Sequence, residues 1–370
     1  MKIIPALILA FFSIIQTASA QFRKYSNEFL NIGAGARGLA MGSAQVASVD
    51  DGTAGYWNPA GLTGVHDYAN ANLMHAEYFA GIGKYDFVNL AIPVAGNKRT
   101  IGITGLRFAV DQIANTLFLV EPDGSINYDN VTDFSAADYA FIFSLAQKLK
   151  ESTNKNVQFG VNAKIIHHSV GKFAKAWGFG LDGGLQIQSN QWRFGVVGRD
   201  FTTTFNAWSF SFTDREKEVL YLTNNEIPVK SSELTAPSLV AGVARDFTLS
   251  KKASLMAEAN VDVTFDGKRN TVISSNPVSV DPKVGVELRI NDVFFVRAGV
   301  KNFQRTIDDG DSTNQKKVWI YQPSAGAGFR IQNVRIDYAL TNLANQSNPL
   351  FTHVFSLQFD LTNDKNKKKK

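Results

Sequence analysis

Apolar and polar side chains alternate with a period of two through most of the chain between residues 69 and 361. In residues 334–341, one face carries Val334, Ile336, Tyr338 and Leu340, and the other carries Arg335, Asp337 and Thr341. Successive side chains of a strand point to opposite faces, so a wall between lipid and a polar lumen requires this parity. The pattern therefore predicts an all-β protein built as a transmembrane β-barrel.

The alternation divides into fourteen predicted strands, an even number, as single-chain bacterial barrels have. They cover residues 69–79, 83–94, 100–110, 134–147, 156–168, 176–188, 191–201, 238–249, 253–265, 281–290, 293–302, 321–332, 334–341 and 352–361. Short connectors alternate with longer ones, such as 111–133 and 202–237, which predicts periplasmic turns at one end and extracellular loops at the other. Both chain termini are then expected in the periplasm.

The first twenty residues have the features of a secretory signal peptide. Lys2 precedes an apolar run over residues 3–15, and Ala18, Ser19 and Ala20 form a small-residue cleavage site. We therefore expect four parts, in chain order. They are a signal peptide (1–20), a compact segment rich in Gly and Ala (21–68), the barrel (69–361) and a Lys-rich periplasmic tail (362–370).

Charge and reactive residues exclude several classes of function. The net charge of +5 comes from Lys2 and the terminal lysines, so no basic face predicts nucleic-acid binding. The chain has no cysteine, which excludes disulfides and thiolate nucleophiles. Adjacent His167 and His168 must point to opposite faces of their strand and cannot share a metal ion. We expect no metal site, no cofactor and no catalytic constellation, and hence no enzyme.

Residues 33–38 read Gly-Ala-Gly-Ala-Arg-Gly and match the dinucleotide-binding fingerprint letter for letter. That motif needs a preceding strand and a surrounding βαβ unit, and the flanking sequence predicts neither. The preferred interpretation is that these glycines let the backbone approach the barrel wall closely.

Charged residues at predicted lumen-facing positions have mixed signs on neighbouring strands. They are Lys164, Asp182, Arg193, Arg199, Glu258, Asp262, Glu287, Arg289, Arg297, Lys301, Arg330, Arg335 and Asp337. A wide barrel has a polar interior whatever its function, so we expect cross-strand ion pairs. A substrate path is the alternative interpretation.

The longest predicted loop, 202–237, carries the aromatic residues Phe205, Trp208, Phe210 and Phe212 ahead of a charged run. Exposed aromatic side chains are uncommon unless something covers them. These four residues either pack over the barrel mouth or anchor a partner protein, since aromatic residues dominate binding hot spots.

Residues 31–42 (Asn-Ile-Gly-Ala-Gly-Ala-Arg-Gly-Leu-Ala-Met-Gly) and 57–62 (Trp-Asn-Pro-Ala-Gly-Leu) resemble the N-terminal signature of the PorV/PorQ family. That family is a Bacteroidota branch of the FadL-like fourteen-stranded outer-membrane barrels. The resemblance is specific over residues 29–64. It implies an outer-membrane location and a plug inside the lumen, with Gly33, Gly35, Gly38, Asn58, Pro59 and Gly61 as its motif residues.

The resemblance also implies a role in type IX protein secretion. Such a barrel would bind the C-terminal sorting domains of cargo, the translocon or the surface attachment complex through its extracellular loops. The alternative is a FadL-like channel for hydrophobic small molecules. That function would require an apolar pocket and a lateral opening in the wall.

Overall fold

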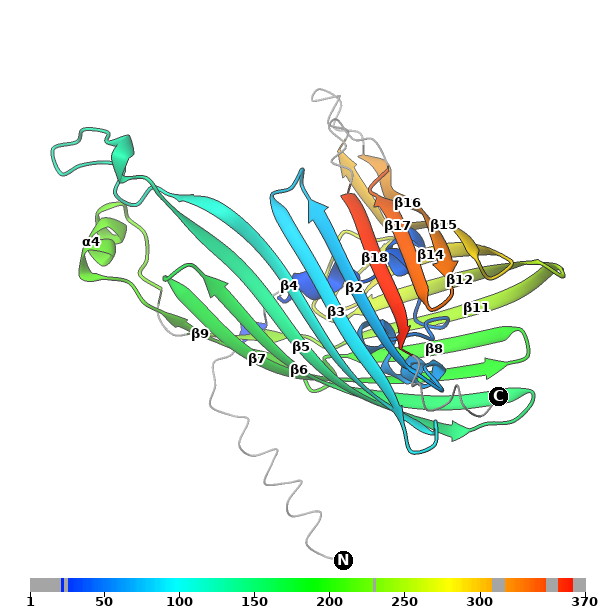
Figure 1. The fold of residues 1–370 in the computed structure, drawn as a ribbon. Coiled ribbons are helices and arrows are strands. Elements are labelled where there is room, and N and C mark those ends of the chain that lie inside the picture. The colour runs from blue at the N-terminus through cyan, green and yellow to red at the C-terminus, as the bar shows by residue number, and fades with distance from the viewer. Residues whose placement is uncertain (1–20, 23–25, 229–230, 308–316, 344–351, 362–370) are drawn as a thin grey trace, which may run out of the picture.

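The computed structural model describes residues 21–22, 26–228, 231–307, 317–343 and 352–361. The predicted signal peptide and the Lys-rich tail lie outside these residues. All the described strands belong to one sheet that curls into a barrel (Figure 1). Among the described residues, no helix is long and apolar enough to cross a membrane.

Fourteen antiparallel strand positions make the wall, two of them interrupted. In chain order they are β2 (Ala69–Tyr78), β3 (Gly83–Val94), β4 (Arg99–Asn115), β5 (Thr132–Lys150), β6 (Lys155–Val170), β7 (Ala174–Ser189), β8 with β9 (Trp192–Arg199 and Thr204–Phe210), β10 with β11 (Ser231–Thr235 and Ser238–Ser250), β12 (Ala253–Thr264), β14 (Ser279–Ile290), β15 (Phe294–Ile307), β16 (Lys317–Ile331), β17 (Val334–Thr341) and β18 (Thr352–Leu361). Pairing of β18 with β2 and of β8 with β11 closes the cylinder. The predicted fourteen-stranded antiparallel barrel is confirmed.

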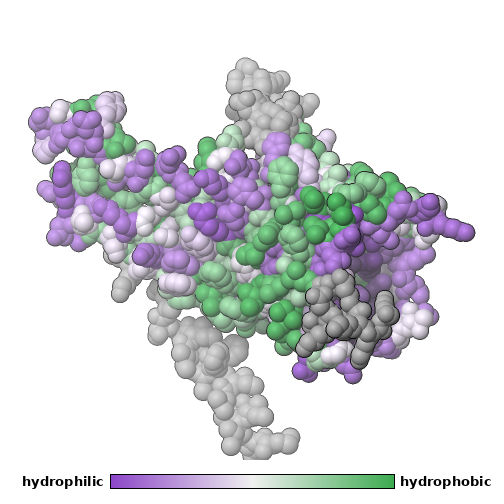
Figure 2. Space-filling view, in the orientation of Figure 1, coloured by the Kyte–Doolittle hydropathy of each residue, from purple (hydrophilic) through white to green (hydrophobic). Residues whose placement is uncertain are grey.

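Side-chain parity separates an apolar outer face from a polar inner face. In β4, Ile101 and Ile103 are exposed on the outer face, whereas Thr100 and Thr104 are buried. The outer face of β4 turns polar at Arg99 and Arg107, which lie about 26 Å apart along a strand that rises about 3.3 Å per residue. That length matches an apolar band about 25 Å tall. Figure 2 shows the hydrophobic surface over the wall and mostly hydrophilic surface at the far upper left.

The wall is interrupted at the same height in two neighbouring strands. β8 pairs with residues 183–189 of β7 and β9 with residues 174–179, so Asp200 and the three residues after it bulge out of register. β11 and β10 likewise pair with β8 and β9 on either side of Ala236 and Pro237. Lys164 forms two ion pairs at the first interruption. Its Nζ lies 2.7 Å from Asp182 and 2.6 Å from Asp200.

The expectation of one long loop over 202–237 is therefore wrong. β9 and β10 continue the wall, and α4 (Asp214–Leu222) lies between them. The reason is visible in the sequence: buried Thr204 and Asn206 alternate with outward-facing Phe205 and Ala207, the parity of a wall strand. The loop predicted over 111–133 is also shorter than expected, because β4 extends to Asn115 and β5 starts at Thr132.

Residues 26–65, called the lumen segment below, lie inside the barrel (Figure 1). They contain four short helices: η2 (Glu28–Asn31), α2 (Ala36–Ala40), α3 (Ala54–Trp57) and η3 (Pro59–Gly64). Helices this short do not hold their shape alone in water. Hydrogen bonds from the backbone between these helices to the wall hold the segment in place. Gly42 N donates to Ser324 Oγ (3.1 Å), and Ala47 N donates to Glu258 Oε1 (2.8 Å).

Glycines allow the lumen segment to touch the wall, and among them is Gly42, the last glycine of the 31–42 signature. A Cβ on Gly299 of β15 would lie 2.1 Å from the backbone of Met41, and Gly42 (φ +61°) meets the backbone of Val300 in the same way. Gly33 and Gly38 instead face Trp57 within the lumen segment itself. The expected close approach to the wall is thus wrong for Gly33 and Gly38, because their role is to fold the segment around Trp57.

Candidate functional site

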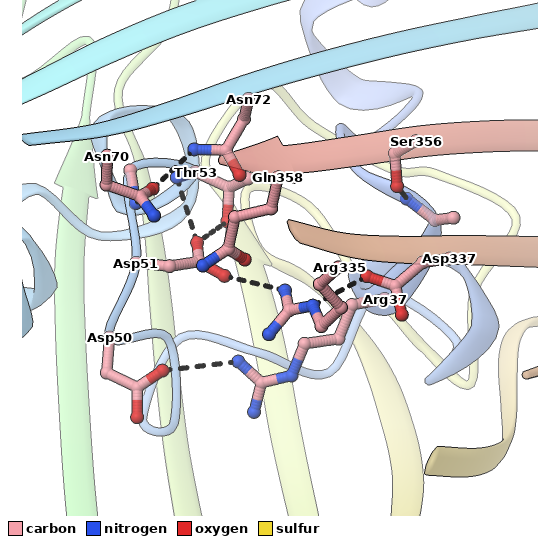
Figure 3. A network of polar contacts seen from close by, with 12 residues as sticks. Arg37, Asp50, Asp51, Thr53, Asn70, Asn72, Arg335, Asp337, Ser356 and Gln358 are labelled. Atoms are coloured by element: carbon pink, nitrogen blue, oxygen red, sulfur yellow. Dashed lines mark hydrogen bonds and ion pairs between the residues drawn. The ribbon is translucent and has the colours of Figure 1, made fainter. Parts of the chain in front are cut away.

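A network of buried ion pairs fixes the lumen segment to the wall (Figure 3). Arg37 of α2 binds Glu287 of β14 through its Nε (3.0 Å) and Nη2 (3.3 Å), and its Nη1 lies 3.5 Å from Asp50. Arg335 of β17 reaches Asp51 of the lumen segment at 3.0 Å. Opposite charges from the segment and the wall therefore neutralise each other where neither is well hydrated.

The wall side of this network consists of cross-strand ion pairs. Arg297 of β15 bridges Glu287 (2.6 Å) and Asp337 of β17 (2.7 Å), and Arg335 binds Asp337 at 2.8 Å. All four of these side chains point into the barrel, as their parity predicts. The expected cross-strand pairing of lumen-facing charges is confirmed for this group. Buried charges need such partners, because an unpaired buried charge is strongly destabilising.

The Asp50-Asp51-Gly52 turn of the lumen segment fits against amide side chains of the wall. Gly52 N donates to Asn70 Oδ1 at 2.9 Å, and Asn72 Nδ2 donates to the same oxygen at 2.7 Å. A Cβ on Gly52 would lie 2.1 Å from the side chain of Asn89. The turn therefore has no room for any residue but glycine.

A cavity of about 490 Å³, called the vestibule below, opens at the long-loop end of the barrel. Leu30, Trp57 and Val240 contribute apolar lining, and Arg199, Lys301 and Asp281 contribute ionisable groups. The guanidinium of Arg199 lies 5.6 Å from the ring of Tyr56, and Lys301 Nζ lies 3.1 Å from Ser43 Oγ. This mixed lining suits a molecule with both an apolar body and a charged or polar group better than a pure hydrocarbon.

A second cavity of about 490 Å³ lies at the short-turn end. Its lining is mainly polar and includes Asp50, Gln158, Gln186, Arg193 and Asp360. The buried lumen segment lies between the two cavities, with Asp50 facing one and Trp57 facing the other.

The wall beside the vestibule is not sealed by strand pairing alone. Pairing of β11 with β12 ends at Ser238 and Thr264, which leaves a gap between β10 and β12. On that side, β10 pairs in parallel with the two-residue strand β1 (Gln21–Phe22). The lumen segment bridges this gap: Asn27 donates to Thr235 Oγ1 of β10 (2.7 Å), and Glu28 pairs with Arg269 of the 265–278 loop (3.2 Å). We call Asn27 and Glu28 the latch.

The latch is tied to the inner wall through His168. His168 Nε2 lies 3.0 Å from Asn27 Oδ1, and its Nδ1 lies 2.6 Å from Asp138. Trp208 of β9 stacks on the same imidazole, with ring centroids 5.3 Å apart. His167 points outward and stacks on Trp177. The predicted opposite orientation of the two histidines is confirmed.

The four aromatic residues predicted as partner anchors do not form one surface. Phe205 faces outward from β9, Trp208 faces inward, and Phe210 stacks on Trp208. Phe212, beyond the strand, stacks on Phe173. Their role in partner binding stays a prediction.

A different exposed apolar surface lies on the projection formed by α4 and residues 116–131, far from the barrel body (Figure 1). Tyr128, Tyr221 and Leu222 are each more than 70 % exposed there, and Arg215 lies 4.5 Å over the ring of Phe118, linking the two parts. The alternation pattern did not reveal this surface, because Tyr221 and Leu222 belong to a helix and end a continuous apolar run, not a period-two strand. The acidic composition of these loops was the sequence signal available for this surface.

Among the described residues, no group of three or more His, Asp or Glu side chains is placed to hold a metal ion. No protein-family model matches the sequence. Comparison with curated proteins likewise finds no match. The resemblance to the PorV/PorQ family therefore stays a prediction.

Solved structures do share the fold. The toluene transporter TbuX of Ralstonia pickettii is 14 % identical, with a TM-score of 0.53 over 89 % of this chain and 98 % of its own. The monoaromatic hydrocarbon channel CymD is 13 % identical, with a TM-score of 0.51 over 90 % and 98 %. A deltaS2S3 mutant of the channel TodX is 10 % identical, with a TM-score of 0.52 over 90 % and 99 %.

These likenesses and the closed sheet define the chain as a fourteen-stranded transmembrane β-barrel. The chain shares the fold of TbuX and CymD, and its expected place among the FadL-like barrels stays a prediction. The solved barrels are described as a transporter and as a channel. That this chain is not an enzyme stays a prediction.

Proposed function

We propose that this protein is an outer-membrane channel for small amphipathic molecules, with the lumen segment as its plug and the latch as its lateral closure. The observation that carries the proposal is the position of the vestibule beside a wall gap that Asn27 and Glu28 bridge. The shared fold with a toluene transporter and a hydrocarbon channel supports the same class of function. The substrate differs from a pure hydrocarbon because Arg199 and Lys301 line the vestibule.

The latch provides a direct test. Replacing both Asn27 and Glu28 with Ala removes the contacts to Thr235 and Arg269, so uptake of a fluorescent medium-chain carboxylic acid into proteoliposomes should become faster. Lys217→Ala, on the surface of α4, is the matched control and should leave uptake unchanged. Equal uptake by the wild type, the latch variant and protein-free liposomes would contradict the channel function.

Type IX secretion is the second candidate function, and one observation favours it. The projection exposes Tyr128, Tyr221 and Leu222 to solvent, which is the kind of apolar surface that marks protein contact sites. Net negative charge surrounds them, from Glu121, Asp123, Asp129, Asp133, Asp214, Glu218 and Glu226 against Arg215 and Lys217, whereas Glu216 is buried and paired with Lys172. A partner with a basic rim around an apolar centre would fit this surface.

Deletion of residues 205–212 would break wall strand β9, so the test of this candidate uses substitutions on the projection. Replacing Tyr128, Tyr221 and Leu222 with Ser should abolish crosslinking in intact cells to translocon or cargo proteins while the barrel still assembles. Leu149→Ser, at an exposed position of β5 near the short-turn end, is the control. Unchanged capture of secretion partners by the triple variant argues against this role.

A further inference from the structure

The hairpin turns at the short-turn end of the barrel form one continuous rim, on the right in Figure 1. Backbone hydrogen bonds join each turn to its neighbour. Lys148 N donates to Lys98 O (3.0 Å), Asn190 N to Asn154 O (3.2 Å), Asp246 N to Gln191 O (3.0 Å) and Asn291 N to Lys252 O (2.8 Å). The side chains from the turn after β3 round to the turn after β14 therefore belong to one surface, called the basic rim below.

Positive charge dominates the basic rim. Its cations are Lys98, Arg99, Lys148, Lys150, Lys155, Lys251 and Lys252, and the carboxylates in and beside it are Asp67, Glu151, Asp246 and Asp292. Two of these carboxylates already have partners, since Glu151 pairs with Lys148 and Asp246 with Arg193, both at 2.9 Å. Among the described residues, no ion pair is found for Lys98, Lys150, Lys155, Lys251 or Lys252, all of them exposed.

The end of the chain adds to this excess. β18 finishes at the same face, because Leu361 pairs with Ala69 and Asp360 N donates to Asn333 O in the turn after β16 (2.8 Å). Residues 362–370 follow outside the described residues, and their sequence contains five lysines and one aspartate. The projection at the opposite end is net negative. The fold thus separates charges by sign between its two ends.

The make-up of the rim favours a polymer with many spaced anionic groups. Between the lysines, the turns consist of the small or polar residues Gly96, Asn97, Ser152, Thr153, Asn154, Asn190, Gln191 and Ser250. Interfaces between folded proteins instead have an apolar centre and few lysines. Lys98, Lys251 and Lys252 lie between strand ends, not on the lipid-facing wall. They therefore project into the aqueous compartment, where a flexible ammonium group can meet anions at irregular spacing.

We propose that the basic rim binds the carboxylate-bearing peptides of the cell wall. In the expected topology the short turns face the periplasm, and the peptidoglycan mesh there carries free carboxylates at every peptide stem. Each exposed lysine makes only a weak contact with such a group. Several contacts made together hold the barrel to the mesh, because after the first one the others form at a high effective concentration. This inference is independent of what the lumen conducts and of any role in secretion.

The test mixes the full-length mature protein in detergent micelles with purified peptidoglycan sacculi and measures co-sedimentation. The wild type should pellet with the sacculi at low salt and be released as the salt concentration rises, because salt screens exposed charges. Changing Lys98, Lys251 and Lys252 together to Gln should lower the apparent association constant about tenfold, the combined effect of three exposed charge contacts. The heat-dependent mobility shift on gels verifies that each variant is a folded barrel.

The matched control changes Lys175, Lys217 and Lys317 to Gln. These lysines are exposed at the long-loop end, so the net charge falls by the same amount while the rim stays intact, and sedimentation should equal that of the wild type. Sacculi whose carboxylates have been converted to amides should not retain the wild type. A variant that ends at Asp364 lacks the terminal lysines, and adding the three rim substitutions to it should weaken its binding further.

Four results would overturn the proposal. In the first, the wild type does not sediment with sacculi at low salt. In the second, amidated sacculi retain it equally well. In the third, the rim variant binds like the long-loop control, or the rim substitutions have no effect once the tail is removed. In the fourth, the rim substitutions reduce retention of phosphatidylglycerol in mixed micelles, seen by native mass spectrometry, and leave sacculus binding unchanged, which would assign the rim to the membrane surface.

Discussion

Arg37 of the lumen segment and Glu287 of β14 form a buried two-bond ion pair, with Arg37 Nε 3.0 Å from Glu287 Oε2 and Nη2 3.3 Å from Oε1. The two residues are 250 positions apart in the chain. This contact attaches the lumen segment to the wall at a point where Arg297 also binds Glu287.

Arg37→Met should loosen the lumen segment without opening the barrel. Breaking one arm of a buried ion pair costs about 3 kcal/mol, near the lower end of the known range because Glu287 keeps Arg297 as a partner. Proteolysis within residues 26–65 should become faster, while the heat-dependent mobility shift of the barrel on gels changes little. Lys217→Met on the surface of α4 serves as the control. Equal proteolysis of both variants would show that the ion pair does not hold the lumen segment in place.

Gly299→Ala should displace the lumen segment by overpacking. The added Cβ would lie 2.1 Å from the Met41 backbone, which cannot rotate away as a flexible side chain would. Overpacking of this kind costs about 1–3 kcal/mol. Gly198→Ala is the control, because its Cβ would meet no atom closer than 3.8 Å. Hydrogen exchange of residues 36–47 should rise in the first variant and stay unchanged in the second.

Lys164→Gln should weaken the interrupted part of the wall. It leaves Asp182 and Asp200 buried together without the ammonium that both contact, and loss of a buried partner costs about 3–5 kcal/mol. The temperature at which the barrel changes mobility on gels should fall. Asp200→Asn in the same chain should restore part of the loss, because it removes one of the unpaired charges. If the double variant is no more stable than Lys164→Gln, like-charge repulsion is not the cause.

Helix α4 should lose stability in acid. Burial acts to raise the pKa of Glu216, but hydrogen bonds from Lys172 and from Thr213 outweigh it and hold that pKa below its ordinary value. A carboxyl group with a depressed pKa stabilises the folded state above its ordinary pKa of 4.5, and this contribution disappears as the pH falls through the folded-state pKa. Hydrogen exchange of residues 213–223, corrected for its intrinsic pH dependence, should show fraying in acid.

The matched variant for this prediction is Glu216→Gln, which removes the titrating group. Its exchange at neutral pH should resemble that of the wild type in acid and should respond little to further acidification. Thr213→Ala, which breaks the capping box with Glu216, should destabilise the helix by about 1 kcal/mol at neutral pH. A wild-type helix with the same corrected exchange at neutral and acidic pH would refute the assignment.

The barrel could be predicted from the sequence because its rule is local. Parity along each strand is visible within a few residues, so the predicted strand at 83–94 agrees with β3 and that at 334–341 agrees with β17. The rule also predicted correctly that Glu287, Arg297 and Asp337 face the lumen. It failed at 202–237, where the bulge after Arg199 shifts the register and the strand continues as β9 beyond an apparent end.

The sequence by itself determined the class of fold and the direction in which most wall side chains point, because a period of two is a property of the extended backbone. Only the tertiary structure decided which distant residues meet: Arg37 with Glu287, Asn27 with Thr235, and Gly105 between Val88 and Phe141. These pairings depend on strand register and on how the lumen segment folds around Trp57. Both are set by contacts between residues far apart in the chain, which no local pattern encodes.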